Sequence, residues 1–566
     1  MLRLSAIRNF GFLIVSALAF IIALIPQDAA NPWMMAPVAI LSICLILSGR
    51  LSQLNYRDPL LFLILLLWLG WTWGAIFSPV PFASKVTLVI LSVLPVGYLF
   101  ALGQDVRKFL YGAIGIITIL AFAAIVHILI NGYYSRARLF FDDENILGGL
   151  IAFVIPMVLN FHFSAQNRKT RILIHIVFAI LTGGLLATQS RSAFIGALIG
   201  IAFVLFKNRT SISRRSLKLA LIPVSILLIA LFTTYFGERL LLMLQMDKDV
   251  TGRFSLYLSA LRMLAIDPLH GVGLGVFHLY YPHYKTLADN SAGFWVHLDP
   301  LQWAVETGIG TAIAFYTLFG TVIWQLCRKD LSPLQIGAGA SLVTIFTISH
   351  INYPFHYTAM ALLAGIFLSV FSAQKKGSAL RWRYLPAAAI TIFLLCLVWT
   401  VMQTAPTLYL WTKALKASQN SDMQTYADNL QICIDKGNPT FPACRIEAAG
   451  FLIRRMPDPP QDVLTWLRDA EAANPASPEA DIWRAQYYLK KNPGNLKLPT
   501  DTLHKALDKN PTLWPPRSLL VQILTSQKKH QEAFDILQES RNWQIDRNAL
   551  DEYYKMERDL MEKLKK

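Results

Sequence analysis

The sequence predicts an all-α, polytopic membrane protein that carries a large external loop and a soluble helical tail. Of its 566 residues, 54% are hydrophobic and only 15% are charged, and the mean hydropathy is +0.44. The apolar residues gather in runs of about 17 to 25, which is the length that crosses ~30 Å of hydrocarbon. We therefore expect a bundle of about 12–13 transmembrane helices over residues 1–403.

The expected spans follow one another along this region, separated by short polar or basic segments. They lie near residues 10–26, 34–48, 59–78, 85–103, 109–131, 146–165, 171–188, 193–206, 217–236, 301–325, 333–350, 357–373 and 383–403. The first follows Arg3 and Arg8 and is not followed by a small-residue cleavage site. We expect it to be kept as a span, with the amino terminus in the cytoplasm.

The distribution of basic residues predicts the topology. Counted from a cytoplasmic amino terminus, the Lys and Arg clusters near residues 50–57, 107–108, 168–171, 207–218, 328–329 and 375–383 fall on the same side of the membrane. The formal net charge of +17 is then explained mainly by the basic residues on the cytoplasmic side, which face anionic lipid. No aromatic-basic motif indicates binding to nucleic acid. The polar stretch 237–300 and everything beyond residue 403 are expected outside the cytoplasm.

Residues 404–566 have the composition of a soluble helical domain. Ala470-Glu-Ala-Ala-Asn-Pro475 and Ala506-Leu-Asp-Lys-Asn-Pro511 recur 36 residues apart, close to the ~34-residue period of tetratricopeptide helix hairpins. The tail thus resembles degenerate tetratricopeptide repeats, with an irregular helical bundle as the alternative. Such stacks bind a protein partner or brace a neighbouring domain, and the sequence does not choose between these roles.

The five cysteines separate into two groups. Cys44, Cys327 and Cys396 lie in or beside apolar spans, where a thiol packs as a small hydrophobe. Cys433 and Cys444 lie in the external tail, where oxidation is permitted, so a disulfide between two helices is expected. Two buried free thiols are the alternative.

Five arginines occupy external loops, which are normally poor in basic residues. They are Arg136, Arg138, Arg191, Arg253 and Arg262. Arg191 lies in a very short turn, Gln189-Ser-Arg-Ser192, with no carboxylate nearby in sequence. Its guanidinium fork suits a lipid phosphate or diphosphate, although snorkelling to ordinary headgroups is the plainer reading.

The external loop 237–300 holds the remaining candidates. Arg253 opens an amphipathic stretch, Phe254–Ile266, that predicts a helix along the membrane surface, and the glycines of Gly271-Val-Gly-Leu-Gly275 favour a tight turn. His297 lies at the mouth of the next span, where an imidazole could take a proton from an acceptor hydroxyl, oriented by Asp299 or Glu306. Other external histidines could serve instead: His270, His278, His283, His350 and His356.

The order and spacing of these motifs resemble those of one known superfamily. The features are Ser190-Arg191-Ser192 before a span, Gly252-Arg253 followed by Asp267-Pro-Leu-His-Gly-Val-Gly-Leu-Gly275, and His297 with Gly308 in an H-x10-G pattern. Together they resemble the O-antigen ligase and O-antigen polymerase superfamily of integral-membrane glycosyltransferases, which includes protein O-oligosaccharyltransferases. The resemblance is strongest over residues 180–310 and implies a GT-C-like membrane fold over residues 1–403.

The resemblance implies a metal-independent, inverting transfer of a glycan from a polyprenyl (undecaprenyl) diphosphate carrier to an acceptor hydroxyl, without a cofactor. By this resemblance Arg191 and Arg253 would bind the diphosphate, and His297 would activate the acceptor. Arg136, Arg138 and Asn145 are secondary candidates, because Asn145 opens the sixth span as in the family. The neighbouring Asp142, Asp143 and Glu144 depart from the family and could bind a metal, pair with Arg138 or be solvated.

The resulting prediction is an O-antigen ligase in a bacterial inner membrane, with a transmembrane domain (1–403), a periplasmic catalytic loop (237–300) and a periplasmic repeat domain (404–566). The acceptor could be a lipid A core sugar, a protein or a growing glycan. A lipid-linked oligosaccharide transporter is the rival from another class, but such a protein would place its cations in a central cavity between repeated halves. A scaffold organised by the tail is a further alternative.

Overall fold

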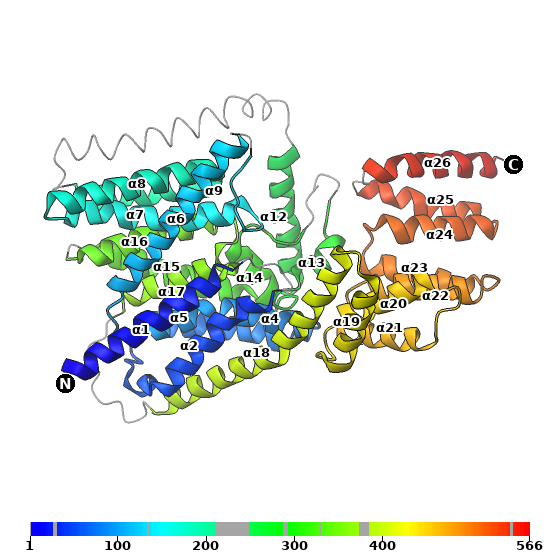
Figure 1. Ribbon diagram of the computed structural model, residues 1–566. Helices are drawn as coiled ribbons and strands as arrows, with labels where there is room; N and C mark the ends of the chain where they lie inside the picture. The colour runs from blue at the N-terminus through cyan, green and yellow to red at the C-terminus, as the bar shows by residue number, and fades with distance from the viewer. Residues whose placement is uncertain are drawn as a thin grey trace.

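The computed structural model describes residues 2–25, 31–132, 135–209, 248–286, 293–328, 330–372, 384–543 and 547–565. Every regular element in these ranges is a helix, which confirms the predicted all-α fold. In Figure 1 the helices up to α17 form one bundle, and those from α19 to α26 form a stack beside it, with α18 running between the two.

The bundle contains the helices that could cross a membrane. Among the described residues seven are long and apolar enough: α3 (Pro59–Ile76), α4 with α5 (Pro81–Leu91 and Val93–Ala101), α6 (Arg107–Asn131), α7 (Glu144–Ser164), α8 (Arg168–Thr188), α15 (Ile309–Leu326) and α18 (Tyr384–Gln419). Shorter apolar helices join them in α1 (Leu2–Ala23), α2 (Ala36–Leu47), α16 (Pro333–Ile348) and α17 (Thr358–Ser369). The chain is therefore a multi-pass membrane protein.

Helix α7 is one of the most buried helices of the bundle, and 83% of its apolar stretch lies inside the protein. It packs against α8, α16 and α9 (Arg191–Lys207). Small residues allow close approach between these helices: Gly200 of α9 lies against the backbone of Ala340 and the side chain of Thr344 in α16. Membrane helices associate through such small-residue contacts, because lipid supplies no hydrophobic drive between them.

The helix boundaries differ from the expected spans and from the expected domain boundary, and one further span is untested. The expected span 301–325 is broken at Gly308, where φ is +88°, into α14 (Asp299–Thr307) and α15. The helix break needs glycine, because a Cβ there would meet the Leu269 carbonyl oxygen. The expected domain boundary at residue 403 falls inside the 36-residue α18. The expected span 217–236 lies outside the described residues.

The described part of the external loop forms a small packed unit. Its elements are α12 (Lys248–Ile266), α13 (Phe277–Tyr280) and the short 3-10 helix η4 (Tyr281–His283), followed by α14. Buried side chains of α12, including Leu256 and Met263, pack with Phe277, Val296 and Val305. The helix expected over 254–266 is thus present and begins six residues earlier, at Lys248.

The tail is a stack of consecutive helices. They are α19 (Met423–Lys436), α20 (Ala443–Arg455), α21 (Asp462–Ala473), α22 (Glu479–Lys491), α23 (Lys497–Lys509), α24 (Trp514–Ser526), α25 (His530–Glu539) and α26 (Arg547–Leu564). Both Asn-Pro steps singled out in the sequence end a helix, α21 before Asn474 and α23 before Asn510. Each helix packs against the next, as expected for a chain of hairpins. Assignment to tetratricopeptide repeats stays a prediction.

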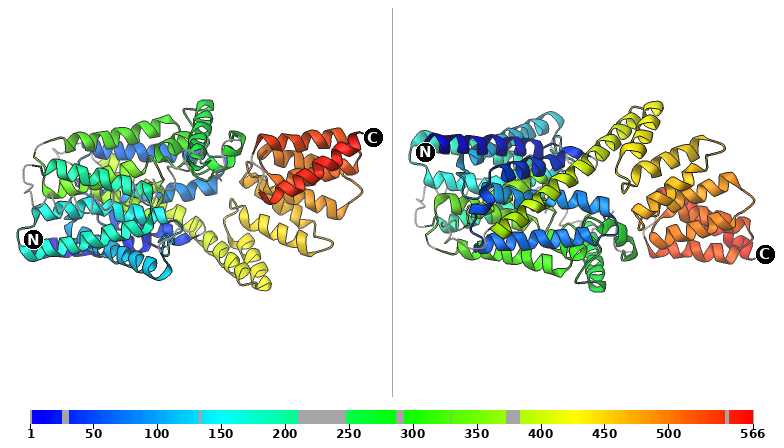
Figure 2. Two further views of the ribbon diagram at one scale, coloured as in Figure 1. Left: turned by 90° about the horizontal axis from the view of Figure 1, so that it is seen from above. Right: turned by 90° about the horizontal axis from the view of Figure 1, so that it is seen from below.

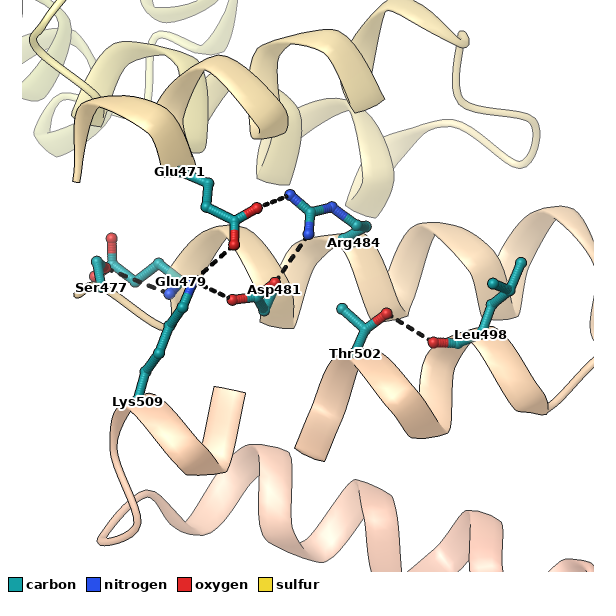
Figure 3. Close-up of polar contacts among 8 residues, drawn as sticks. All are labelled: Glu471, Ser477, Glu479, Asp481, Arg484, Leu498, Thr502 and Lys509. Atoms are coloured by element: carbon teal, nitrogen blue, oxygen red, sulfur yellow. Dashed lines mark hydrogen bonds and ion pairs between the residues drawn. The ribbon is translucent and has the colours of Figure 1, made fainter. Parts of the chain in front are cut away.

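Charged side chains tie three of the tail helices together (Figure 3). Arg484 of α22 pairs with Asp481 at 2.9 Å and with Glu471 of α21 at 2.6 Å. Lys509 of α23 pairs with Glu471 at 2.9 Å and Asp481 at 2.6 Å, and the side chain of Asp481 is fully buried. In the same domain a disulfide joins Cys433 of α19 to Cys444 of α20.

The tail stands to one side of the bundle, as Figure 2 shows from above and below, and two contacts between described residues join it to the membrane domain and the external loop. Phe441, between α19 and α20, lies against Phe82 of α4 with ring centroids 4.6 Å apart. The ring Nε2 of His283 lies 2.9 Å from the carbonyl oxygen of Lys509, at the end of α23. The external loop is therefore in direct contact with the tail.

Candidate active site

His297 lies in a strained loop conformation at the entrance to α14. Its φ of +57° belongs to the left-handed region, which is uncommon for a residue with a side chain and needs support from its surroundings. That support includes the Tyr257 hydroxyl, which donates to the His297 carbonyl at 3.4 Å, and the Tyr353 ring, whose centroid lies 5.0 Å from the imidazole. Ring atom Nδ1 is buried and has no hydrogen-bond partner among the described residues.

The environment of His297 favours its neutral form. Burial, followed by the positive charge of Arg253, lowers the pKa of the imidazole to about 4. A hydrogen bond with the Asn352 side chain and the charge of Asp143 act in the opposite direction without offsetting these effects. At neutral pH the ring is thus uncharged and can accept a proton.

Arg253 lies on α12 and reaches the same region as His297. Its Nη1 donates to the Ile351 carbonyl oxygen at 3.4 Å, while its side chain stays exposed. The electrostatic effect of Arg253 on the pKa of His297 and of Tyr353 places the three groups in one neighbourhood. An exposed guanidinium beside a neutral imidazole is suited to binding an anion next to a proton acceptor.

The glycine-rich turn, residues 271–275, is hydrogen-bonded to α14, the helix that follows His297. Gly271, Gly273 and Gly275 all have positive φ, and the turn binds α14 through Val272 N to Val305 O at 2.9 Å and Gly273 N to Glu306 O at 3.0 Å. The Glu306 side chain is buried there, accepting from Gln302 Nε2 at 2.7 Å and Phe277 N at 3.3 Å. Glu306 therefore braces the turn, in place of the expected role of orienting His297.

Asp299 is likewise directed to a different partner. Its fully buried carboxylate accepts from His356 Nδ1 at 2.9 Å and from Phe355 N at 3.2 Å. The histidine oriented by Asp299 is thus His356, in the 3-10 helix η5 (Pro354–His356), and not His297. In the sequence His356 was one of several external histidines, and no local pattern linked it to Asp299 across 57 residues.

A second group of predicted residues gathers where α7 and α9 begin. The Ser190 hydroxyl donates to Asn145 Oδ1 at 2.6 Å, and Asp143 caps α7 by accepting from Asn145 N at 2.8 Å. Arg136 forms an ion pair with Glu144 and donates from Nη2 to the Gln189 carbonyl at 3.3 Å. Arg191, the first residue of α9, is half-buried at this junction.

The two groups are neighbours. Asp143 affects the pKa of both His297 and Tyr353, and the Tyr353 ring lies 5.5 Å from that of Tyr357. Tyr357 also lines a mostly apolar pocket with Phe141 and Ile146, next to Asp143 in the sequence. The Arg253 and His297 region is therefore linked through Asp143 to the start of α7.

The remaining predicted residues lie at the edge of this region. Arg138 and Arg262 are exposed. Within the described ranges, no three His, Cys, Asp or Glu residues form a group that could hold a metal ion. The acids considered for that role have other partners, since Asp143 caps α7 and Glu144 pairs with Arg136 rather than Arg138.

Comparison with known protein families finds a match that covers the candidate site. Residues 176–316 match the family model described as O-antigen ligase. The match spans Arg191, Arg253, the glycine-rich turn and His297, and it begins inside α8 and ends inside α15. No curated protein matches the chain.

Residues 176–316 are thus similar to the O-antigen ligase family, which supports the superfamily that the motifs had indicated. The family suggests a glycosyltransferase-like enzyme that transfers glycans at a membrane.

Proposed function

We propose that the protein transfers a glycan from polyprenyl diphosphate to an acceptor hydroxyl on the outer face of a bacterial inner membrane. The observation that carries the proposal is the meeting of Arg253 and His297 at residues 351–353, inside a domain of the O-antigen ligase family. An anion-binding group and a proton acceptor side by side are what transfer from a diphosphate requires.

The proposed reaction is a single displacement with inversion. The acceptor oxygen forms a new bond to the anomeric carbon, and the bond from that carbon to the phosphate oxygen breaks. The acceptor proton passes to the imidazole of His297, and the electron pair leaves with the polyprenyl diphosphate. Arg253 and Arg191 stabilise the negative charge of this leaving group, as donors aimed at developing charge do in other enzymes.

Guanidinium groups can supply the charge stabilisation that a divalent metal gives other enzymes acting on diphosphates. We therefore expect transfer without added metal. Treating the purified protein with EDTA should leave the rate within about twofold. A loss that magnesium or manganese restores would contradict this expectation.

We propose a lipid A core sugar as the acceptor, which makes the protein an O-antigen ligase. A protein hydroxyl would make it an O-oligosaccharyltransferase, and a second carrier-linked glycan would make it a polymerase. The tail, as a periplasmic stack of tetratricopeptide type, would bind a partner or brace the loop that it contacts through His283 and Lys509.

Reconstitution in liposomes tests the proposal directly. The donor is a polyprenyl diphosphate oligosaccharide, offered with core lipid A, with a candidate protein, or with a second carrier-linked glycan. Mass spectrometry then shows which acceptor gains the mass of the glycan. Gain on none of the three, together with movement of intact donor across the bilayer, would identify a transporter instead.

A further inference from the structure

Residues 349–357 join α16 to α17 and support the candidate site, although the proposed function assigns no chemistry to them. Ile351 accepts the hydrogen bond of Arg253, and the Tyr353 ring packs against the imidazole of His297. The Asn352 side chain forms a hydrogen bond with His297. This segment therefore contacts both residues to which the proposed function assigns chemistry.

The contact of Asn352 helps to hold the imidazole in place. Its hydrogen bond with His297 acts to raise the pKa of the ring, although burial and the charge of Arg253 outweigh this effect. The Tyr353 ring, whose centroid lies 5.0 Å away, packs against the same imidazole. Nδ1 of His297 is buried and has no hydrogen-bond partner in the described part of the chain.

A buried acid and histidine tie this segment to the loop that carries His297. Asp299, two residues after His297, binds Phe355 and His356 through its carboxylate and the Ser349 carbonyl through its backbone N–H at 2.9 Å. Both ends of the segment are thus bound to one residue. The side-chain exposures of His356 and Asp299 are 5% and 0%, so the bond is shielded from water.

An aromatic side chain extends this connection. The Trp295 ring lies 4.5 Å from the His356 ring and 5.1 Å from the Tyr353 ring, between centroids. Trp295 and Asp299 flank His297 at equal separations in the sequence. A displacement of His356 would therefore disturb the loop on both sides of His297.

We propose that His356 and Asp299 are a positioning pair that holds Asn352 and Tyr353 against His297 and thereby keeps its imidazole oriented toward the acceptor. The inference rests on the proposed function of His297. His356 acts through Asn352 and does not touch the substrate. Partners that orient a metal-bound imidazole typically change activity by about 10–100-fold when they are removed, and we expect an effect of that size here.

Two substitutions of His356 separate positioning from catalysis. His356→Phe keeps a planar ring but removes the donor to Asp299, whereas His356→Asn places an amide N–H near the position of Nδ1. In the liposome transfer assay, His356→Phe should lower kcat by about 10–100-fold with the KM for the polyprenyl diphosphate donor within about twofold. His356→Asn should recover to within about threefold of the wild type. Equal loss in both variants would overturn the positioning role.

A double-mutant cycle tests whether His356 acts through Asn352. If it does, the double variant His356→Phe with Asn352→Ala should be no slower than the slower single variant. Losses that multiply would overturn the proposal. His350→Gln is the matched control from the same segment, because its ring faces Tyr316 Oη at 3.1 Å and the Phe346 carbonyl at 2.7 Å; its rate should stay within about twofold.

A structure of the His356→Phe variant tests the positioning role of His356 without an activity measurement. The proposal requires the Tyr353 ring to move away from His297, beyond the 5.0 Å of the parent protein. An unmoved segment would overturn it. If the wild-type protein transfers no glycan, the proposed function fails, and this structural arm still tests the pair.

Discussion

Charged and titratable side chains are paired differently in the tail and in the membrane domain. In the tail, Glu471, Asp481, Arg484 and Lys509 are paired with one another across three helices. In the membrane domain, Asp299 and His356 are similarly paired, but beside them Arg253 is exposed and Nδ1 of His297 has no partner among the described residues. A closed network stabilises a fold, whereas groups with open bonding capacity are available to a ligand.

Among the tests of this comparison, replacement of His297 should have the largest effect on the rate of glycan transfer. His297→Gln keeps a polar side chain but no titrating base, so we expect transfer to fall by about 10²–10⁴-fold. Yield and the thermal melting curve in detergent should stay close to those of the parent. Normal glycan transfer by this variant would show that the proton acceptor lies elsewhere.

Replacement of Arg253 or Arg191 should have the next largest effect on the rate of transfer. Arg253→Ala and Arg191→Ala should each lower transfer by about 10²–10³-fold, because a donor to the leaving diphosphate is lost. Lys at either position should restore only part of the rate, since a point charge does not reproduce the planar fork. Arg262→Ala, on the same helix as Arg253, should lose less. An active Arg253→Ala variant would remove that residue from the site.

Breaking the tail network should affect stability and not the chemical step. Asp481→Ala leaves Arg484 and Lys509 with fewer partners, and removal of one side of a buried ion pair costs about 3 kcal/mol or more. Limited proteolysis of the full chain should then show earlier cleavage within residues 462–509. Lys529→Ala, from the exposed pair with Glu532, is the control and should stay within about 1 kcal/mol of the parent. Equal protection of both variants would mean that the network adds no stability.

The pH dependence of kcat/KM should show the smallest change. Because the pKa of His297 is lowered to about 4, its neutral form remains dominant as pH falls from 7 to 5. We expect little loss of kcat/KM in that interval and a decline only as pH approaches 4, since this parameter reports the free enzyme. A decline centred near 6.5 would indicate an imidazole with an ordinary pKa.

Some parts of the site could be anticipated from local sequence. Arg191 and Arg253 were conspicuous because external loops rarely keep arginine, and His297 with Gly308 fitted a spacing pattern. The helix that follows Arg253 and the helix ends at the Asn-Pro steps were also predictable. In each case the signal lies within about ten residues of chain, where helix geometry and proline sterics act.

Other parts depended on contacts between distant segments. The sequence suggested Asp299 and Glu306 as partners of His297, but folding turns Asp299 toward His356 and Glu306 toward the glycine-rich turn. The expected span 301–325 was interrupted at Gly308 because α14 carries buried polar side chains that bind the loop. Hydropathy averages over a window and does not register which individual side chains find a partner.

The sequence by itself determined that this chain is an all-α, multi-pass membrane protein with a segment similar to the O-antigen ligase family, because span length and motif spacing are properties of contiguous residues. The tertiary structure decided which groups face one another: the segment 349–357 against His297, and His283 against the tail. Such pairings join residues tens to hundreds of positions apart, and they are selected by how the helices pack, which no local pattern encodes.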